Sequence, residues 1–392
     1  MDNKKIIPFM VGIPNLSVGL LWAMNMSLIP MLVGTVTSSN SQLGLLTGMG
    51  AFTGIFVQYL AGMISDRSHF KMGKRKPFVI GGATLAALFI ALLPFQKSYA
   101  SMFAIAFLFY FSLNFFQGPY YTLIPEVVEE NQLGLANGFS KIVSVLGSGI
   151  ILLLGAKLWG MNHTYPFFLA SALGILSVII GAAFIKERKD HYTKPEKISF
   201  DFTKYPAVMK LYLSVFFIFL SYGCITPFFV KYCISQLGLS ADTASMGLFL
   251  LTIVGAIFAV PAGILSDKIN RRVVLLAGTI IFAIAIFLAT FVHGVMMLYL
   301  LLSLIGIGFI CIQVTIYAIL AQIAPAARLG EFMGIMNLFI SLSQWMATLA
   351  MGFLLDAVGF GCFFPIAGVI MAIAAIIVAL SHYDLPEKDE VA

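Results

Sequence analysis

The fold of this chain is indicated by two nearly identical stretches, Gly62-Met-Ile-Ser-Asp66-Arg67 and Gly263-Ile-Leu-Ser-Asp267-Lys268, which lie 201 residues apart. Each stretch ends a long apolar segment and opens a basic loop. Three further residues recur at a constant offset of 196: Tyr121, Gly134 and Gly138 return as Tyr317, Gly330 and Gly334. The sequence therefore predicts an internal duplication, which is a common feature of membrane transport proteins.

The composition is that of a membrane protein. Hydrophobic residues make up 60% of the chain, charged residues make up 10%, and the mean hydropathy is +0.99. A soluble chain carries about a quarter charged residues. Apolar segments long enough to cross a bilayer of about 30 Å recur along the chain. We predict twelve helical spans, at 8–34, 41–65, 76–95, 99–124, 132–156, 166–186, 207–236, 241–266, 271–292, 295–323, 329–356 and 360–382.

The twelve spans divide into six and six around one long charged stretch. This pattern predicts an all-α membrane protein with two pseudo-symmetric six-helix bundles. We expect an N-terminal bundle over 1–186, a cytoplasmic linker over 187–206 and a C-terminal bundle over 207–392.

The basic residues are distributed by loop and do not gather on one soluble domain. Of the 23 lysines and arginines, 19 lie in the two tails and in the connections that follow even-numbered spans. The positive-inside rule therefore places both termini and the linker in the cytoplasm. A nucleic-acid partner is disfavoured, and we expect a multi-pass protein of the plasma (inner) membrane.

Motifs of soluble enzymes are missing from the sequence. It contains no GxSxG, no HExxH and no Walker lysine with its upstream glycine. Its four cysteines have no CxxC or histidine-rich spacing, so we read them as small hydrophobic residues. We therefore predict no enzymatic activity, no cofactor and no metal. The pairs Gly44/Gly48 and Gly330/Gly334 predict close helix packing.

The repeated Gly-x-x-Ser-Asp-Arg/Lys motif, followed by basic residues, resembles the signature of the major facilitator superfamily after the second and eighth spans. An aspartate at a helix end can accept hydrogen bonds from arginine and face the positive end of another helix. We interpret these residues as a cytoplasmic gate, with these members: Asp66, Arg67, Arg75 and Glu126 in the first half, and Asp267, Arg271 and Arg272 in the second. The alternative is that these charges only fix the topology, which is our interpretation of Lys71, Lys74 and Lys76.

The first half has a closer resemblance, to the sucrose/proton symporter (glycoside-pentoside-hexuronide type) branch of that superfamily. It rests on motifs in the order that this branch shows them: Gly19-x-x-Trp22-Ala23, Ser27-Leu-x-Pro30, Val57-Gln58, Gly73-Lys-Arg-Lys-Pro77-Phe78, Asn114-x-x-Gln117-Gly118-Pro119 and Ala136-Asn137-x-Phe139-Ser140. The resemblance implies a monomeric twelve-helix carrier for a glycoside, driven by a proton gradient. Tyr121 stands where those sucrose transporters typically carry arginine.

The resemblance also implies that the first, fourth, seventh and tenth spans line the cavity. On the fourth span, polar residues at steps of four, three and four share one helical face. Amides and hydroxyls next to aromatic rings suit a neutral polyhydroxylated ligand. We predict these substrate-binding residues: Trp22, Asn25, Asn114, Gln117, Tyr121, Tyr222, Gln313, Tyr317, Asn337 and Gln344. The alternative for each is a hydrogen bond that only joins helices.

The sequence thus predicts a secondary transporter for a small neutral glycoside, with protons as the expected coupling ion. No Asp or Glu is expected near the middle of the membrane, so Glu126 is the best coupling candidate, and Lys141 is an intramembrane charge of interest. Two alternatives stay open. One is an efflux carrier for an amphipathic compound, using the 36 Phe and 19 Met as an adaptable apolar cavity. The other is a membrane sensor that does not transport.

Overall fold

The computed structural model describes residues 3–68, 70–185, 187, 205–325 and 328–383. Within these residues the secondary structure is entirely helical, and twelve helical segments are long and apolar enough to cross a membrane. They span Ile6–Met26, Asn40–Asp66, Lys76–Phe95, Tyr99–Val127, Leu133–Met161, Tyr165–Phe184, Pro206–Ser235, Ala241–Lys268, Arg271–Ala289, Val295–Ile323, Leu329–Val358 and Phe360–Leu380. The predicted all-α fold with twelve spans is confirmed.

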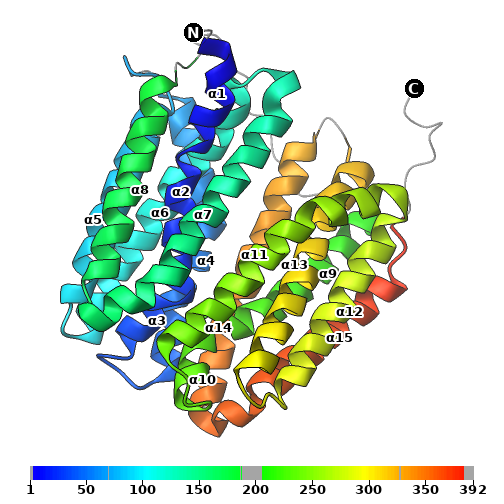
Figure 1. The fold of residues 1–392 in the computed structure, drawn as a ribbon. Helices are drawn as coiled ribbons and strands as arrows, with labels where there is room; N and C mark the ends of the chain where they lie inside the picture. The colour runs from blue at the N-terminus through cyan, green and yellow to red at the C-terminus, as the bar shows by residue number, and fades with distance from the viewer. Residues whose placement is uncertain (1–2, 69, 186, 188–204, 326–327, 384–392) are drawn as a thin grey trace. The chain divides into compact units, whose positions relative to one another are not determined.

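The α-helices are labelled in Figure 1 in chain order. Their bounds are α1 (Asn3–Gly12), α2 (Asn15–Met26), α3 (Leu28–Val33), α4 (Asn40–Asp66), α5 (Lys76–Leu92), α6 (Tyr99–Val127), α7 (Leu133–Met161), α8 (Tyr165–Phe184), α9 (Pro206–Ile225), α10 (Phe229–Ser235), α11 (Ala241–Lys268), α12 (Arg271–Ala289), α13 (Val295–Ile323), α14 (Leu329–Val358) and α15 (Phe363–Leu380).

The chain forms two compact units. Unit 1 comprises 1–194 and 230–249, and unit 2 comprises 195–229 and 250–392. Inside unit 1, α2 packs on α7 and α8, while α5 packs on α6 and α8; inside unit 2, α9 packs on α14 and α15, while α12 packs on α13 and α15. These are the same pairs of spans in each repeat, as expected from duplication. The predicted linker 187–206 lies almost entirely outside the described residues, so the predicted domain boundaries stay a prediction.

The first and seventh spans differ from the prediction, because neither is one continuous helix. The first breaks before Asn15 and again at Ser27, and the seventh breaks between Ile225 and Phe229. The break before Asn15 lies beside Pro14. The breaks at Ser27 and after Ile225 lie beside Pro30 and Pro227, whose nitrogens carry no hydrogen to bond the preceding helical turn. The two prolines are 197 residues apart and occupy matching places in the repeats. As a result, α3 and α10 are separate short helices at the ends of their spans.

Glycine sets the closest approach between helices in unit 1. A Cβ at Gly19 of α2 would lie 1.9 Å from the carbonyl oxygen of Ser144 in α7, and one at Gly147 of α7 would lie 2.4 Å from that of Leu16. The prediction of close packing is wrong for Gly330 and Gly334, because a Cβ at either meets nothing within 4 Å. Small residues permit helix contact, but the neighbouring helix decides where it occurs.

Candidate functional site

The polar residues of unit 1 converge from three helices. Trp22 and Asn25 come from α2, Tyr110 comes from α6, and Gly50 of α4 lies between the rings. A Cβ at Gly50 would be 3.2 Å from Trp22 Cζ3 and 3.1 Å from Tyr110 Cδ1. The Tyr110 hydroxyl donates a hydrogen bond to Asn25 Oδ1. Trp22 and Asn25 are only half-buried, so part of the indole and part of the amide remain accessible to a ligand.

Asn114, by contrast, joins two helices. Its Nδ2 donates to Gly50 O at 3.0 Å, to Thr53 Oγ1 at 2.9 Å and to Tyr110 O at 3.1 Å. Its Oδ1 accepts from Gln58 Nε2 at 2.8 Å, and the side chain is fully buried. Both ends of the amide are therefore hydrogen-bonded within the α4–α6 pair, and the structure favours the interhelical alternative for this residue.

Gln117, one turn further along α6, has a different environment. Its side chain is 3% exposed, and its Nε2 has no hydrogen-bond partner among the described residues. Leaving a buried donor unpaired costs about 1–3 kcal/mol. The amide is therefore available to a water or ligand oxygen. Tyr121, a further turn along, is 43% exposed.

The predicted residues of unit 2 fall into two groups. Tyr222 of α9 is half-buried and stacks on Phe309 of α13, with ring centroids 4.5 Å apart and an interplanar angle of 8°. Gln344 of α14 is half-buried. Its backbone lies close to α9, since a Cβ at Gly223 of α9 would be 2.9 Å from the Cα of Gln344. Phe309 is a residue that the sequence analysis missed, and only its apolar ring marks it in the sequence.

The second group carries the repeat of the Gln/Tyr pair. Gln313 of α13 is half-buried. The Tyr317 hydroxyl donates to Asn337 Oδ1 of α14 at 3.2 Å, and both side chains are exposed. Tyr317 is 39% exposed, close to the value of its counterpart Tyr121. The two tyrosines thus have matching exposure in their own units.

An ionic cluster forms at one end of unit 1, around Arg75. Its guanidinium donates to Glu126 through Nη2 at 2.6 Å and through Nε at 2.8 Å. The same group lies 2.6 Å from Asp66 Oδ1 and donates to Ser65 Oγ at 3.1 Å. Lys74 Nζ adds a second cation 3.0 Å from Glu126 Oε1, so its interpretation as a residue that only fixes topology is corrected. Three of the predicted gate residues, Asp66, Arg75 and Glu126, are therefore brought together.

Glu187, just after α8, supports this cluster and was missed by the sequence analysis. Its carboxylate accepts hydrogen bonds from three consecutive backbone amides, at 2.7 Å from Lys74, 3.0 Å from Arg75 and 2.6 Å from Lys76. Gly73 makes this turn possible with a φ of +113°, which disfavours any residue with a Cβ. The carboxylate satisfies the free amides at the start of α5 and fixes the backbone that carries Arg75.

The surroundings of Arg75 stabilise its charge. Burial of the guanidinium acts to lower the pKa of Arg75, because it removes water from the cation. The hydrogen bond and charge of Glu126, with the charges of Asp66 and Glu187, outweigh burial and raise the pKa of Arg75 above its ordinary value. The guanidinium is therefore a permanent cation at the centre of the cluster.

The equivalent end of unit 2 is built differently. Asp267 pairs with Arg271 at 2.9 Å one turn away, and that arginine also donates to the carbonyl of Ala318 at 2.8 Å. Arg272 donates to the carbonyls of Val378 and Ala379 in the last turn of α15. These contacts satisfy helix carbonyls, and they do not surround a shared carboxylate as Arg75 and Lys74 surround Glu126.

Two predicted residues lie outside these groups. Arg67 is exposed at the end of α4, and Lys141 is exposed on α7. Among the described residues no group of three or more His, Cys, Asp or Glu side chains is arranged to hold a metal ion.

Comparison with known proteins shows the family to which the chain is similar. An uncharacterised MFS-type transporter of Methanocaldococcus jannaschii is 25% identical over 340 residues, which are 84% of each chain. A sucrose transport protein of Arabidopsis thaliana is 25% identical over 165 residues, 38% of this chain and 32% of that relative. The crystal structure of a bacterial homologue of the human lysosomal transporter Spinster, inward-facing and occupied, matches with a TM-score of 0.78 at 15% identity, covering 96% of each chain. The model of the Major Facilitator Superfamily matches residues 13–207 and 211–391, and the chain therefore belongs to this family.

Proposed function

We propose that this family member is a secondary transporter for a small neutral glycoside. The observation that carries the proposal is the set of half-buried or unsatisfied polar groups beside aromatic rings in each unit. In unit 1 these are the Trp22 indole, the Asn25 amide and the unpaired Gln117 Nε2. Sugar hydroxyls need donors and acceptors of this kind, and sugar faces stack on rings. The partial similarity to a sucrose transport protein supports the same class of ligand.

The Gln/Tyr pair of each repeat provides the test, and its members are Gln117, Tyr121, Gln313 and Tyr317. Losing one hydrogen bond to a buried polar ligand costs about 1–3 kcal/mol, so alanine at each position should weaken glycoside binding by about five- to a hundredfold. Thermal-shift screening of disaccharides against lipophilic cations would identify the ligand, and calorimetry on the purified protein would measure the affinities.

Ser171 of α8 is the matched control for these variants. Its hydroxyl donates to the carbonyl of Ala87 at 2.8 Å, so Ser171→Ala also removes a hydrogen bond but leaves the proposed site intact. We expect its glycoside affinity to stay within twofold. If all four site variants bind like Ser171→Ala, the glycoside proposal fails; a response to lipophilic cations alone would favour the efflux alternative. Measurable uptake into liposomes would distinguish both kinds of transporter, for a glycoside or for a lipophilic cation, from a sensor that does not transport.

We further propose that both termini face the cytoplasm in the plasma membrane and that the Arg75 cluster is part of the cytoplasmic gate. A cysteine at Asn162, which is exposed in the connection after α7, should react with an impermeant thiol reagent added outside intact cells. A cysteine at Ser199, outside the described residues, should not react. Cys362 lies half-buried at the start of the twelfth span and is first replaced by serine. Reversed labelling of the two positions would contradict the topology.

A further inference from the structure

The connection between α4 and α5 presents apolar and basic side chains together on the surface of unit 1. Phe70 is 55% exposed, Met72 is 59% exposed, and Lys71 between them is exposed as well. Arg67, which follows the last residue of α4, is also exposed. We call these four residues the α4–α5 patch. Exposed apolar side chains beside basic ones are typical of segments that lie at a membrane surface.

The two cations of the patch are not used inside the protein, unlike their neighbours in the same connection. Arg75 and Lys74 both pair with Glu126. Among the residues that the structure describes, the side chains of Arg67 and Lys71 make no ion pair and no hydrogen bond. Their charges therefore remain available to an anion outside the chain.

The length of α4 places the patch in the headgroup layer of a bilayer. The helix has 27 residues. At a rise of 1.5 Å per residue it is about 40 Å long. The hydrocarbon core of a bilayer is about 30 Å thick, and the headgroup regions bring the total to about 40–45 Å. A helix of this length crosses the core and ends among the headgroups, so the cations at its end lie near the level of the lipid phosphates.

Contacts on both sides hold this connection in place. The Phe70 ring packs edge-on against Phe78 in the first turn of α5, with ring centroids 5.9 Å apart. The ring of Phe78 in turn lies 5.9 Å from that of Phe115 in α6. At the far end of the connection, the Glu187 carboxylate accepts the backbone hydrogen bonds described above. A surface that is already ordered binds a partner at a lower entropic cost.

We propose that the α4–α5 patch binds an anionic phospholipid, such as phosphatidylglycerol. Arg67 and Lys71 donate hydrogen bonds to the lipid phosphate, and Phe70 and Met72 contact the acyl chains just below it. Basic residues at a membrane surface favour anionic lipids over zwitterionic ones, because each adds attraction to the negative headgroup. The patch contains none of the residues proposed to bind glycoside, so the proposal does not depend on the glycoside function.

The test measures which lipid the full chain retains in detergent. Phosphatidylglycerol and phosphatidylcholine with the same acyl chains are added in equal amounts, and native mass spectrometry identifies the first lipid bound. We expect phosphatidylglycerol to be retained about tenfold over phosphatidylcholine. Arg67→Gln combined with Lys71→Gln should reduce this preference to less than about twofold, whereas Arg67→Lys combined with Lys71→Arg should keep it. Retention in the charge-conserving variant shows that the loss comes from the charge and not from misfolding.

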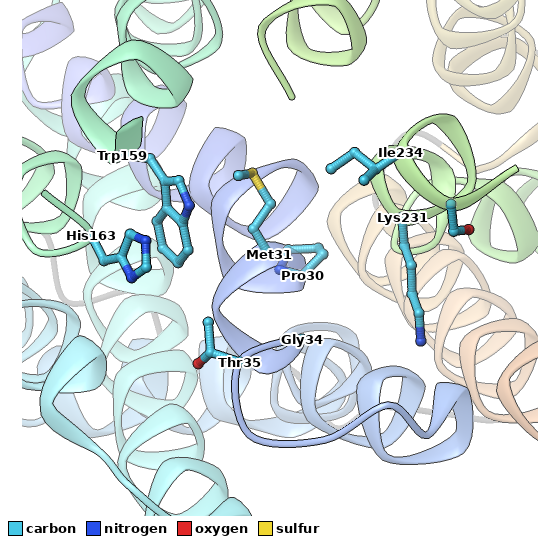
Figure 2. A pocket seen from close by; sticks show the side chains of 9 residues that line it. Pro30, Met31, Gly34, Thr35, Trp159, His163, Lys231 and Ile234 are labelled. Carbon is cyan, nitrogen blue, oxygen red and sulfur yellow. The ribbon is translucent and has the colours of Figure 1, made fainter. Parts of the chain in front are cut away.

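A matched control removes the same charge elsewhere in unit 1. Lys97 and Lys157 are exposed near the opposite ends of the spans, and Lys157 lies two residues before Trp159, which lines the pocket shown in Figure 2. Lys97→Gln combined with Lys157→Gln should leave the lipid preference unchanged. Phe70→Ser combined with Met72→Ser should weaken retention of both lipids and keep the headgroup preference, because it removes only apolar contacts.

Four results would overturn the proposal. They are equal retention of the two lipids by the original chain, a preference that survives in the Arg67/Lys71 glutamine variant, an equal loss in the Lys97/Lys157 variant, and unchanged retention in the Phe70/Met72 variant. Inorganic phosphate in large excess distinguishes a lipid from a free anion. It should not displace phosphatidylglycerol, since it offers no acyl chains; displacement would show a phosphate site instead of a lipid site.

Discussion

The Gly19→Ala variant should lose about 3 kcal/mol or more of folding free energy, at or above the upper end of the usual cost of overpacking. The new Cβ would lie 1.9 Å from Ser144 O, 2.7 Å from Ser144 C and 3.0 Å from its Cα. All three atoms belong to the backbone of α7, so no side chain can rotate away. Helix α2 must move off α7 as a whole, which also disturbs the contact of Gly147 with Leu16.

Gly81→Ala is the matched control for this measurement. Gly81 lies inside α5, and a Cβ there meets nothing within 4 Å. Alanine is the better helix former by about 1 kcal/mol, so this variant should be as stable as the original chain or slightly more stable. Thermal unfolding of both purified proteins compares them directly. Similar melting temperatures for Gly19→Ala and Gly81→Ala would show that α2 and α7 are not packed as closely as the structure describes.

The contrast between Gly19 and Gly330 shows why the sequence predicted the helices but not their contacts. Apolar length alone locates the twelve spans, because a bilayer requires about twenty apolar residues per helix. Both glycines lie in such spans with other small residues nearby. The difference comes from the neighbouring helix: Gly19 lies against the backbone of α7, whereas a Cβ at Gly330 meets nothing within 4 Å. The breaks in the first and seventh spans were also missed, although Pro30 and Pro227 mark them in the sequence.

The gate cluster was predicted in part. Asp66 belongs to a repeated motif and Arg75 follows it, and Glu126 lies near the end of a span that carries a family motif, so each had a local signal. Glu187 had no such signal in the sequence, because it lies in a charged stretch that was predicted to be a linker. Its contact with Arg75 joins residues 112 positions apart and is formed only when the chain folds. Asn114 was predicted to bind substrate, because the sequence cannot distinguish a cavity from a neighbouring helix; in the structure its amide contacts α4.

Glu126 is the residue on which proton coupling is expected to depend. It is an ion-paired carboxylate of unit 1, and the duplication places Gln322, an amide, at the matching position of the second repeat. A carboxylate beside two cations stays ionised. It can therefore take up a proton only in a conformation in which its contacts with Arg75 and Lys74 are broken. This requirement would link proton binding to the opening of the cluster.

We expect Glu126→Gln to abolish accumulation of substrate driven by a pH gradient, while exchange of substrate between the two sides remains measurable. Glutamine keeps the shape of glutamate and can still accept a hydrogen bond from Arg75, but its amide has no proton that it can bind and release as a carboxylate does. Uptake into proteoliposomes with and without an imposed gradient, followed by counterflow with substrate on both sides, separates the two activities.

Glu331→Gln provides the control, since it is the same substitution at another carboxylate paired with an arginine, 2.7 Å from Arg328 in unit 2. That pair lies within one turn at the start of α14, so it need not break when a gate opens, and accumulation should survive its loss. If accumulation persists in Glu126→Gln, the proton is carried elsewhere. If both variants lose it, the effect reflects general damage to ion pairs. Only loss in the first with retention in the second assigns coupling to the carboxylate that Arg75 and Lys74 share.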